Sequence, residues 1–161
     1  MTRLGVVDYG GRIHGMVTGP FRQVDPDLRV VAVVDPDEPR VRERLADCDD
    51  DVVFYESIGA MMRGTDLDAV AVGTCCNLHA GIATELAAFD RPLFLEKPVA
   101  TTLEDAIALE HAFENSRCQV VVSFPLRVSP LCALARQYIE SDAVGEPLHV
   151  HAVNYVPYGT V

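Results

Sequence analysis

Short apolar runs that alternate with helix-like segments constrain this chain more than any other feature. The runs are continuous and rich in β-branched residues, with no apolar-polar alternation inside them. Such runs are typical of parallel strands that helices cover on both faces. The repeated order of strand and helix predicts an α/β fold, a doubly wound parallel sheet with right-handed crossovers. Strands are expected at 4–7, 30–34, 69–72, 93–95 and 120–122, with a weaker strand at 52–55.

The segments between the expected strands carry start and stop signals of helices. Ser57 is a suitable N-cap for a short helix that ends at Gly64. Residues 77–89 are rich in Ala and Leu, with apolar side chains at helical spacing. The sequence Thr101-Thr102-Leu103-Glu104 has the pattern of a capping box, which predicts the start of a further helix. The helices thus fall where crossover connections of a parallel sheet belong.

The pattern changes after Ser123. Prolines interrupt residues 124–130, and a helix is expected over residues 131–141. After a turn at Gly145-Glu146-Pro147, residues 148–155 alternate as in a strand with one solvated face. One helix and one strand cannot bury a second core. We therefore expect one domain at 1–123 and the beginning of an incomplete α+β domain at 124–161.

Composition and charge exclude several classes of protein. Hydrophobic residues make up 49% of the 161 residues, which is enough for a sizeable core. The formal net charge of −11 argues against binding to nucleic acid and against attraction to anionic membranes. No stretch approaches the roughly 20 apolar residues of a transmembrane helix, and no signal-peptide pattern opens the sequence. Cytoplasmic residence is therefore expected.

The cysteines and histidines do not indicate a metal site. The five cysteines are odd in number and lack C-x-x-C spacing, which argues against a disulfide framework or structural zinc. The adjacent pair Cys75-Cys76 is most simply two small residues in a loop at the end of a strand. His149 and His151 share one face of the last expected strand, but a third ligand is missing from the pattern. No metal is expected.

The first turn from strand to helix, Asp8-Tyr9-Gly10-Gly11-Arg12-Ile13, indicates a nucleotide site. Glycines at this place let a pyrophosphate approach the backbone N–H groups at the start of a helix. Asp8 and Ile13, however, stand where the G-x-G-x-x-G pattern has its first and third glycines. A carboxylate near a pyrophosphate is repulsive unless it points away or is neutralised, and Arg12 is placed to neutralise it. The alternative interpretation is an ordinary glycine turn.

Asp35 ends the second expected strand, where dinucleotide-binding folds often place an acidic residue. Its carboxylate can accept hydrogen bonds from the hydroxyls of the adenosine ribose and repel a 2′-phosphate. This favours NAD over NADP as the cofactor. The alternative is that Asp35-Pro36-Asp37 caps the next helix. Its spacing from the glycine turn and its place at a strand end favour ribose binding.

Glu96-Lys97-Pro98 closes the expected strand at 93–95. Open α/β sheets place their chemistry at the carboxyl ends of their strands. An ammonium group there can polarise a carbonyl or relay a proton, and Glu96 offers it a countercharge. Pro98 restricts the backbone of Lys97, so that the lysine is held in one direction. The alternative is a surface ion pair before a turn.

Together these motifs resemble the N-terminal half of the glucose-fructose oxidoreductase, inositol dehydrogenase and rhizopine-catabolism family (Gfo/Idh/MocA). The resemblance spans nearly the whole chain in the order of the family, and its most specific element is Glu96-Lys97-Pro98. The further matching elements are the glycine turn, Val33-Val34-Asp35-Pro36, Thr74-Cys75-Cys76-Asn77-Leu78-His79, Arg127 with Pro130, and Gly145-Glu146-Pro147.

The resemblance implies a Rossmann-type NAD(P)-binding domain at residues 1–123 and the start of a truncated substrate domain after it. It also implies an NAD(P)-dependent oxidoreductase that passes a hydride between nicotinamide and a sugar, polyol or related hydroxy compound. Members of the family carry further proton-transfer groups in the substrate domain, downstream of residue 161. This chain would then supply the half that binds the cofactor.

The resemblance assigns roles to single residues. It implies that Lys97 is the catalytic group near the reacting hydroxyl, and that Glu96 holds Lys97 or its loop. For two of the implied cofactor residues an alternative stays open: His79 can cap the start of a helix, and Arg127 can form an interdomain salt bridge. The implied cofactor-binding residues are Tyr9, Gly10, Gly11, Arg12, Asp35, Thr74, Asn77, His79, Glu96, Lys97 and Arg127.

The expected cofactor is NAD, and the expected partner is a small sugar or polyol, with neither nucleic acid nor membrane. The open edge of the incomplete second domain favours self-association, so a homo-oligomer is compatible with the sequence. The rival hypothesis is a noncatalytic dinucleotide-binding or regulatory protein that senses NAD(H) without turnover. Asp8 favours the rival, whereas Lys97 beside Glu96 favours the enzyme.

Overall fold

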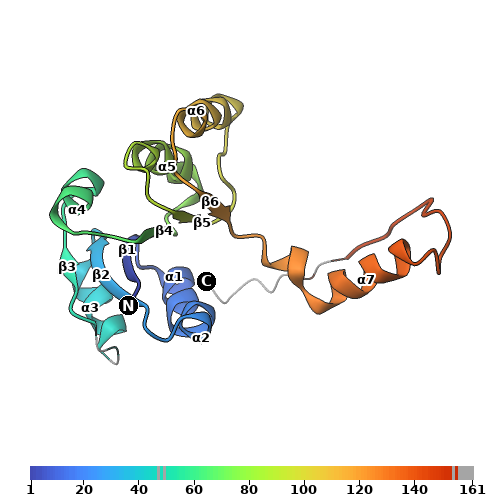
Figure 1. Cartoon of the computed structure of the whole chain (residues 1–161), viewed down its shortest axis with the longest axis horizontal. Helices are drawn as coiled ribbons and strands as arrows, with labels where there is room; N and C mark the ends of the chain where they lie inside the picture. Colours follow the sequence, from blue (N-terminus) through green and yellow to red (C-terminus); the bar gives the residue numbers. More distant parts are fainter. Residues whose placement is uncertain (47, 49, 154, 156–161) are drawn as a thin grey trace. The chain divides into compact units, whose positions relative to one another are not determined.

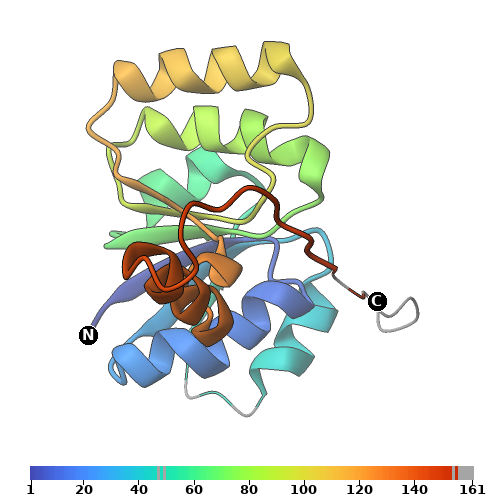
Figure 2. The same cartoon turned by 90° about the vertical axis from the view of Figure 1, so that its right-hand side faces the viewer.

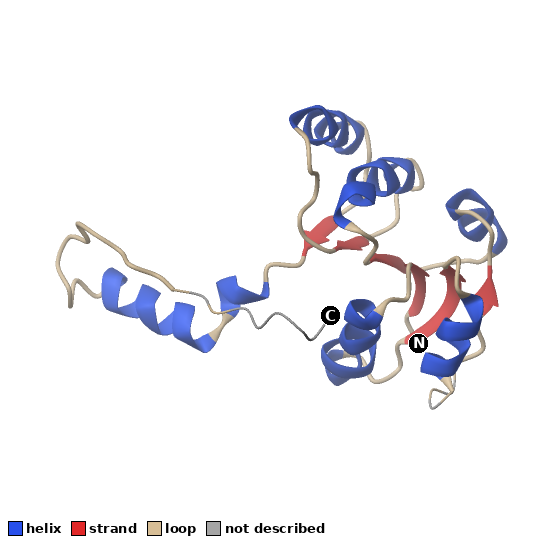
Figure 3. Cartoon of the chain, turned by 180° about the vertical axis from the view of Figure 1, so that it is seen from behind, coloured by secondary structure: helices blue, strands red, loops and turns tan. Residues whose placement is uncertain are grey.

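Six parallel strands form one sheet (red in Figure 3), in the order β3-β2-β1-β4-β5-β6. The computed structural model describes all residues except 47, 49, 154 and 156–161, and it divides into two units, Met1–Ser123 and Phe124–Val161. The strand order reverses between β1 and β4, which makes this the topological switch point of the sheet. The doubly wound parallel sheet predicted from the sequence is therefore confirmed. The strands are β1 (Arg3–Val7), β2 (Arg29–Val34), β3 (Val53–Phe54), β4 (Ala69–Val72), β5 (Leu93–Leu95) and β6 (Val120–Val122).

Helices cover the sheet from both sides (Figure 1). One face carries α1 (Gly11–Met16), which continues through the π-helical turn η1 (Val17–Phe21) into α2 (Arg22–Val24), and α3 (Glu38–Leu45). The other face carries α4 (Ile58–Gly64) and α5 (His79–Ala87), the latter preceded by the 3-10 turn η2 (Cys76–Leu78). The helix α6 (Leu103–Glu114) lies alongside α5 as an outer layer (Figures 1 and 2). Among the described residues, none of these helices has the length and apolarity to cross a bilayer.

Successive residues of one strand enter two different apolar cores. In β1, Val6 packs in the core beneath α1 and α3, whereas Val7 packs in the core beneath α4 and α5. In β4, Ala71 belongs to the first of these cores, and Val70 and Val72 belong to the second. Side chains alternate between the two faces of a strand, and here both faces are covered. This double burial explains why the strand sequences are continuously apolar.

Side-chain caps begin two of the helices where the sequence suggests. The Ser57 hydroxyl accepts a hydrogen bond from the Ala60 N–H at the start of α4. At α6 the predicted capping box is shifted by one residue, because Thr102 is the N-cap and not Thr101. The Thr102 hydroxyl accepts from the Asp105 N–H at 3.1 Å and donates to the Asp105 carboxylate at 2.7 Å. The Asp105 carboxylate thus bonds the Thr102 hydroxyl, whereas the acidic side chain of a capping box bonds the backbone N–H of the N-cap residue.

The second unit contains a 3-10 turn, η3 (Pro125–Val128), and α7 (Pro130–Glu140), which Ser129 caps. Gly145 follows in the left-handed region with φ +64°, as a turn requires. The strand expected at 148–155 is wrong for residues 148–153, which have no regular structure, and Asn154 lies outside the described residues. A strand needs a neighbouring strand for its ladder of hydrogen bonds, and the described part of this unit offers none.

Ile13 replaces the third glycine of the nucleotide-binding pattern by packing against a different glycine. Its side chain is fully buried between α1 and the sheet. A Cβ atom on Gly73, which directly follows β4, would overlap the Ile13 side chain, with the Cδ1 atom only 2.9 Å away. Packed atoms do not approach each other so closely. The Ile13 side chain therefore fits at this place only because residue 73 is glycine.

We expect Gly73→Ala to lower the free energy of unfolding by about 1–3 kcal/mol, because the added methyl overpacks the contact with Ile13. In a double-mutant cycle measured by urea unfolding, Ile13→Ala should relieve part of the overpacking. The double variant should then lose about 1 kcal/mol less free energy of unfolding than the two single variants lose together. Gly15→Ala is the control, since a Cβ at Gly15 meets nothing within 4 Å. Strict additivity would contradict the proposed contact.

Candidate functional site

The turn after β1 presents open backbone at the carboxyl edge of the sheet. Gly10 is the N-cap of α1 with an extended backbone, φ −66° and ψ 175°, and no side chain caps the helix. The first N–H groups of a helix have no partner inside it and therefore remain available to an anion. A Cβ atom on Gly10 would lie only 3.2 Å from a carboxylate oxygen of Asp8, so the turn has room for glycine but little for a side chain. A turn without side chains lets a phosphate group approach the backbone, as the sequence predicts.

Asp8 adopts the left-handed backbone conformation that the first glycine of the pattern usually supplies, with φ 64°. Its N–H donates to the Val34 carbonyl at 2.9 Å, which fixes the turn to the end of β2. The expected pairing with Arg12 is wrong: the guanidinium near the Asp8 carboxylate belongs to Arg40, at 3.8 Å. Burial raises the pKa of the Asp8 carboxyl and Asp35 raises it further, while Arg40 acts in the opposite direction.

Asp35 holds the two loops beside it together through its side chain. Its carboxylate accepts hydrogen bonds from the Tyr9 N–H at 2.9 Å and the Asp37 N–H at 2.8 Å. Both oxygens also accept from Nη2 of Arg40, each at 3.0 Å. The carboxylate has no exposed surface. Asp37 caps α3 by accepting from the Arg40 N–H, so the helix-capping interpretation of this segment describes the observed contacts.

Arg12 connects the glycine turn to the end of β5. Its Nε donates to the Glu96 carboxylate at 2.8 Å, and its Nη2 lies 3.4 Å from the Ser123 hydroxyl. The Glu96 side chain is 7% exposed, whereas that of Arg12 is 50% exposed. Glu96 therefore holds the turn in place rather than pairing with Lys97. Neighbouring residues of an extended chain point to opposite sides, which separates these two side chains.

Lys97 is exposed at the carboxyl end of β5, and no ion pair or hydrogen bond joins its side chain to the described residues. The Lys97–Pro98 peptide bond is cis. The Pro98 carbonyl lies 2.6 Å from Nδ1 of His79, and the Thr74 carbonyl lies 2.9 Å from Nε2 of the same ring. A neutral imidazole donates to one of these oxygens and an imidazolium to both.

His79 is therefore a buried link between two loops, with 1% of its surface exposed. Its side chain does not reach the surface where a cofactor contact was expected. Thr74 is half-buried and Asn77 is exposed, so these two residues of the loop after β4 remain accessible to a ligand. Arg127 lies in the second unit, where its guanidinium is 5.4 Å from the centre of the Phe124 ring.

The Tyr9 side chain lies in the core and not over the turn. Its ring is fully buried and makes an edge contact with His14, at 5.7 Å between ring centres. Burial raises the pKa of the hydroxyl, for which the described residues offer no hydrogen-bond partner. The expected contact of this side chain with a cofactor is therefore not supported by its position.

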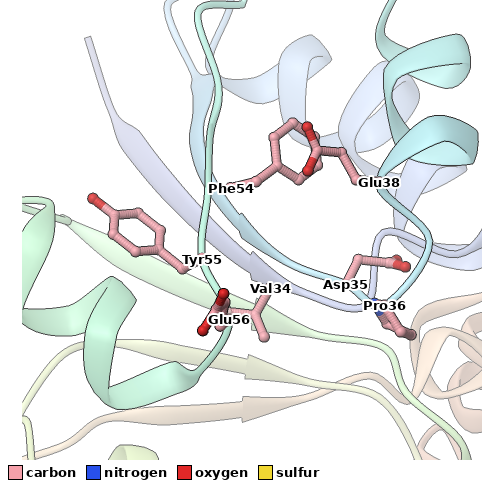
Figure 4. Close-up of a pocket in the computed structure, with 7 residues that line it drawn as sticks. All are labelled: Val34, Asp35, Pro36, Glu38, Phe54, Tyr55 and Glu56. Carbon is pink, nitrogen blue, oxygen red and sulfur yellow. The ribbon is translucent and has the colours of Figure 1, made fainter.

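A cleft of about 530 Å³ opens at the ends of β2 and β3 (Figure 4). Its walls include the acidic residues Asp35, Glu38 and Glu56 beside Phe54 and Tyr55. Three acidic residues make this cleft unsuitable for phosphate groups, in contrast to the turn at Gly10. Within the described part of the chain, no three His, Cys, Asp or Glu side chains are grouped to hold a metal ion.

The structure gathers most of the predicted site residues at one edge of the sheet. Gly10, Asp35, Thr74 and Lys97 follow the ends of four strands, β1, β2, β4 and β5. Arg40 and Ser123 were missed by the sequence analysis. The sequence could have indicated Arg40, because it stands in the first turn of the helix that follows Asp35. It could not have indicated Ser123, because a single serine after the last strand forms no recognisable pattern.

A family model described as "Oxidoreductase family, NAD-binding Rossmann fold" matches residues 2–124. The chain belongs to the Gfo/Idh/MocA family. Family membership makes it an NAD-binding Rossmann protein, as the sequence resemblance implied. Among solved structures, a myo-inositol dehydrogenase from Lactobacillus casei in complex with NAD(H) and myo-inositol shares the fold with a TM-score of 0.81 at 24% identity, over 92% of this chain and 44% of that chain.

Several relatives have named activities. Inositol 2-dehydrogenase 1 of Saccharopolyspora erythraea is 30% identical over 127 residues, which are 78% of this chain and 38% of that protein. Levoglucosan dehydrogenase of Pseudarthrobacter phenanthrenivorans is 30% identical over 123 residues, 76% of this chain and 31% of that protein. The WlbA dehydrogenase of Bordetella pertussis, solved with NADH and UDP-GlcNAcA, is 26% identical with a TM-score of 0.75, over 89% of this chain and 43% of that chain. This chain spans less than half the length of these proteins.

We expect Asp8→Asn to stabilise the protein more at pH 7 than at pH 3. The folded-state pKa of Asp8 lies above its unfolded value, so the folded state binds this proton more tightly. Stability therefore falls as the pH rises through the folded-state pKa, and Asn, which does not ionise, avoids that loss. Urea unfolding at the two pH values measures the difference. Asp142→Asn is the control, because Asp142 shares the left-handed backbone, with φ 57°, but is exposed; equal gains at both pH values would contradict the expectation.

We expect Tyr9→Phe to raise the free energy of unfolding by about 1 kcal/mol, because it removes a buried hydroxyl without a partner. Its dissociation constant for NADH should not change, since the ring lies in the core. Tyr55→Phe is the matched control: the Tyr55 hydroxyl lies 2.7 Å from that of Thr65, so its loss should destabilise the protein. If calorimetry shows that Tyr9→Phe binds NADH more weakly than the wild type, the Tyr9 hydroxyl contacts the cofactor and the expectation is wrong.

Proposed function

We propose that this chain is the cofactor-binding half of an NAD-dependent oxidoreductase that acts on a sugar, polyol or related hydroxy compound. The observation that carries the proposal is the exposed Lys97, on the same sheet edge as the uncapped turn at Gly10. The relatives support the substrate class, because inositol and levoglucosan dehydrogenases are among them. The remaining length of those relatives would supply the substrate domain, which residues 124–161 begin.

The cofactor residues of the proposal are those that remain accessible. Gly10 and Gly11 would hold the pyrophosphate against the start of α1, and Thr74 and Asn77 would border the nicotinamide half. NAD supplies the acceptor of the hydride when it is bound. Arg12 and Glu96 would act through position, since their ion pair fixes the turn to the lysine loop. Arg127 stays in the proposal on the resemblance to the family alone.

When the substrate is reduced, the Lys97 ammonium would donate its proton to the carbonyl oxygen, and when the substrate is oxidised, the neutral amine would accept the proton of the hydroxyl. The Lys97 ammonium is exposed, and Glu96 does not neutralise it because that carboxylate faces Arg12. The loop that carries it is fixed by the contact of His79 with the Pro98 carbonyl. A positioned proton donor and acceptor of this kind typically contributes about 10²- to 10⁴-fold to the rate.

Two further parts of the proposal concern where and how the protein acts. We infer a cytoplasmic protein, in keeping with its acidic composition, and self-association through the second domain. The second candidate function is a noncatalytic sensor of NAD(H). It is favoured by Asp8, whose carboxylate lies close to Gly10, where the pyrophosphate has to approach.

Titration calorimetry of the chain with NADH, and separately with NADPH, tests the proposal. We expect micromolar binding of NADH and much weaker binding of NADPH. Gly10→Val should weaken NADH at least about tenfold, or about 1.4 kcal/mol, because its side chain projects into the approach of the phosphates. Gly19→Ala is the control, because a Cβ at Gly19 meets nothing within 4 Å. The absence of NADH binding would overturn the proposal.

Lys97→Ala separates the enzyme from the sensor. In the chain joined to its substrate domain, this variant should bind NADH as the wild type does and lose polyol oxidation, followed by the absorbance of NADH. Unchanged turnover would remove Lys97 as the catalytic group. If the wild type binds NADH but oxidises no polyol, the sensor is favoured.

A further inference from the structure

We propose that Cys75 and Cys76 form a dithiol site that captures trivalent arsenic compounds at the carboxyl edge of the sheet. The two residues follow Thr74 in the loop after β4, and both are exposed. The site itself is independent of the proposed function. Its expected effect on NADH rests on that function, because Thr74 and Asn77 on either side of the pair would border the nicotinamide half.

Cys75 and Cys76 differ in accessibility from the other cysteines of the first unit. Cys48 and Cys118 are half-buried, and the Cys118 thiol donates to the Arg91 carbonyl at 2.9 Å. Among the described residues, neither sulfur of the pair has a hydrogen-bond partner. Soft ligands bind to thiolates that they can reach, so an accessible pair without partners is the suitable place for them.

The backbone beneath the two thiols is fixed. The Cys75 carbonyl accepts a hydrogen bond from the Leu78 N–H at 2.9 Å, which closes the turn η2. The Thr74 carbonyl lies 2.9 Å from Nε2 of His79, whose ring is buried. When both sulfurs bind one centre, only the side-chain torsions of the pair remain to be ordered. The entropic cost of binding is therefore small.

The spacing of the two cysteines favours a bridging atom over a disulfide. Adjacent Cα atoms lie about 3.8 Å apart, whereas most disulfides join Cα atoms about 4.4–6.8 Å apart. A direct S–S bond between neighbours in the chain is therefore strained and easily reduced. An atom placed between the two sulfurs lengthens the bridge and removes this constraint.

The number of available ligands favours arsenic(III) over a metal ion such as zinc. Zinc sites take at least three ligands from the protein, and within the described part of the chain no three His, Cys, Asp or Glu side chains are grouped to hold an ion. An organic arsenic(III) compound needs only two sulfurs. With phenylarsine oxide, two As–S bonds form and the bond between arsenic and oxygen breaks. The oxygen leaves as water with both thiol protons, and the arsenic stays trivalent.

Intact mass spectrometry of the 161-residue chain treated with phenylarsine oxide tests the site. The wild type should carry one phenylarsenic group, which the monothiol glutathione leaves in place and the dithiol dithiothreitol removes. In competition with glutathione, Cys75→Ser and Cys76→Ser should each bind the group at least about 100-fold more weakly, because a linked second sulfur acts at a high effective concentration. Cys132→Ser is the control, since it removes the remaining exposed thiol and should leave the binding unchanged.

The effect on the cofactor is measured by calorimetry with NADH. The chain that carries the phenylarsenic group should bind NADH at least about tenfold more weakly than the untreated chain, because the group stands between Thr74 and Asn77. NADH added first should slow the modification. Unchanged binding of NADH by the modified chain would overturn the overlap with the cofactor site.

The outcomes separate the dithiol site from the proposed function. If glutathione strips the group from the wild type, or if either single variant retains it, the inference is wrong, and the proposed function stands as long as the untreated chain binds NADH. If the group is retained as expected and the untreated chain binds no NADH, the proposed function falls and the dithiol site stands. Circular dichroism of each variant checks that it is folded.

Discussion

The ion pair between Arg12 and Glu96 is the interaction on which the arrangement of the site depends. A nearly buried carboxylate is strongly unfavourable without a partner, and Arg12 supplies the opposite charge. The pair joins the first helix to the end of β5, and Ser123 joins the same guanidinium to the end of β6. Because the Arg12 guanidinium is half exposed, solvent screens the pair, and its loss costs less than the loss of a fully buried pair. The turn and the lysine loop are thus fixed to each other by charge.

A second arginine organises the opposite end of the edge. Arg40 holds Asp35 and faces Asp8, so the carboxylates near the end of β2 gather around one guanidinium. Arg12 thus pairs with the carboxylate at the end of β5, and Arg40 pairs with those at the ends of β1 and β2. Lys97 has no carboxylate partner among the described residues. Because it lacks such a partner, its ammonium is free to contact a ligand.

The sequence was sufficient for the strands, because their double burial leaves a continuous apolar pattern that few other structures produce. It was also sufficient for the edge where Gly10, Asp35, Thr74 and Lys97 meet, because parallel strands bring their carboxyl ends together. It failed where a role depends on orientation. Glu96 and Lys97 are adjacent in sequence but face different ways, and Tyr9 and His79 are buried although they stand in loops of the site. Pairings across the sheet, such as that of Arg12, leave no local pattern to read.

The imidazole of His79 has a consequence for the behaviour of the whole edge. It contacts the Thr74 carbonyl on one side and the Pro98 carbonyl on the other, so two loops that follow different strands share one rigid ring. The loop that Thr74 begins and the loop that carries Lys97 are therefore held in one arrangement by a side chain that belongs to neither of them.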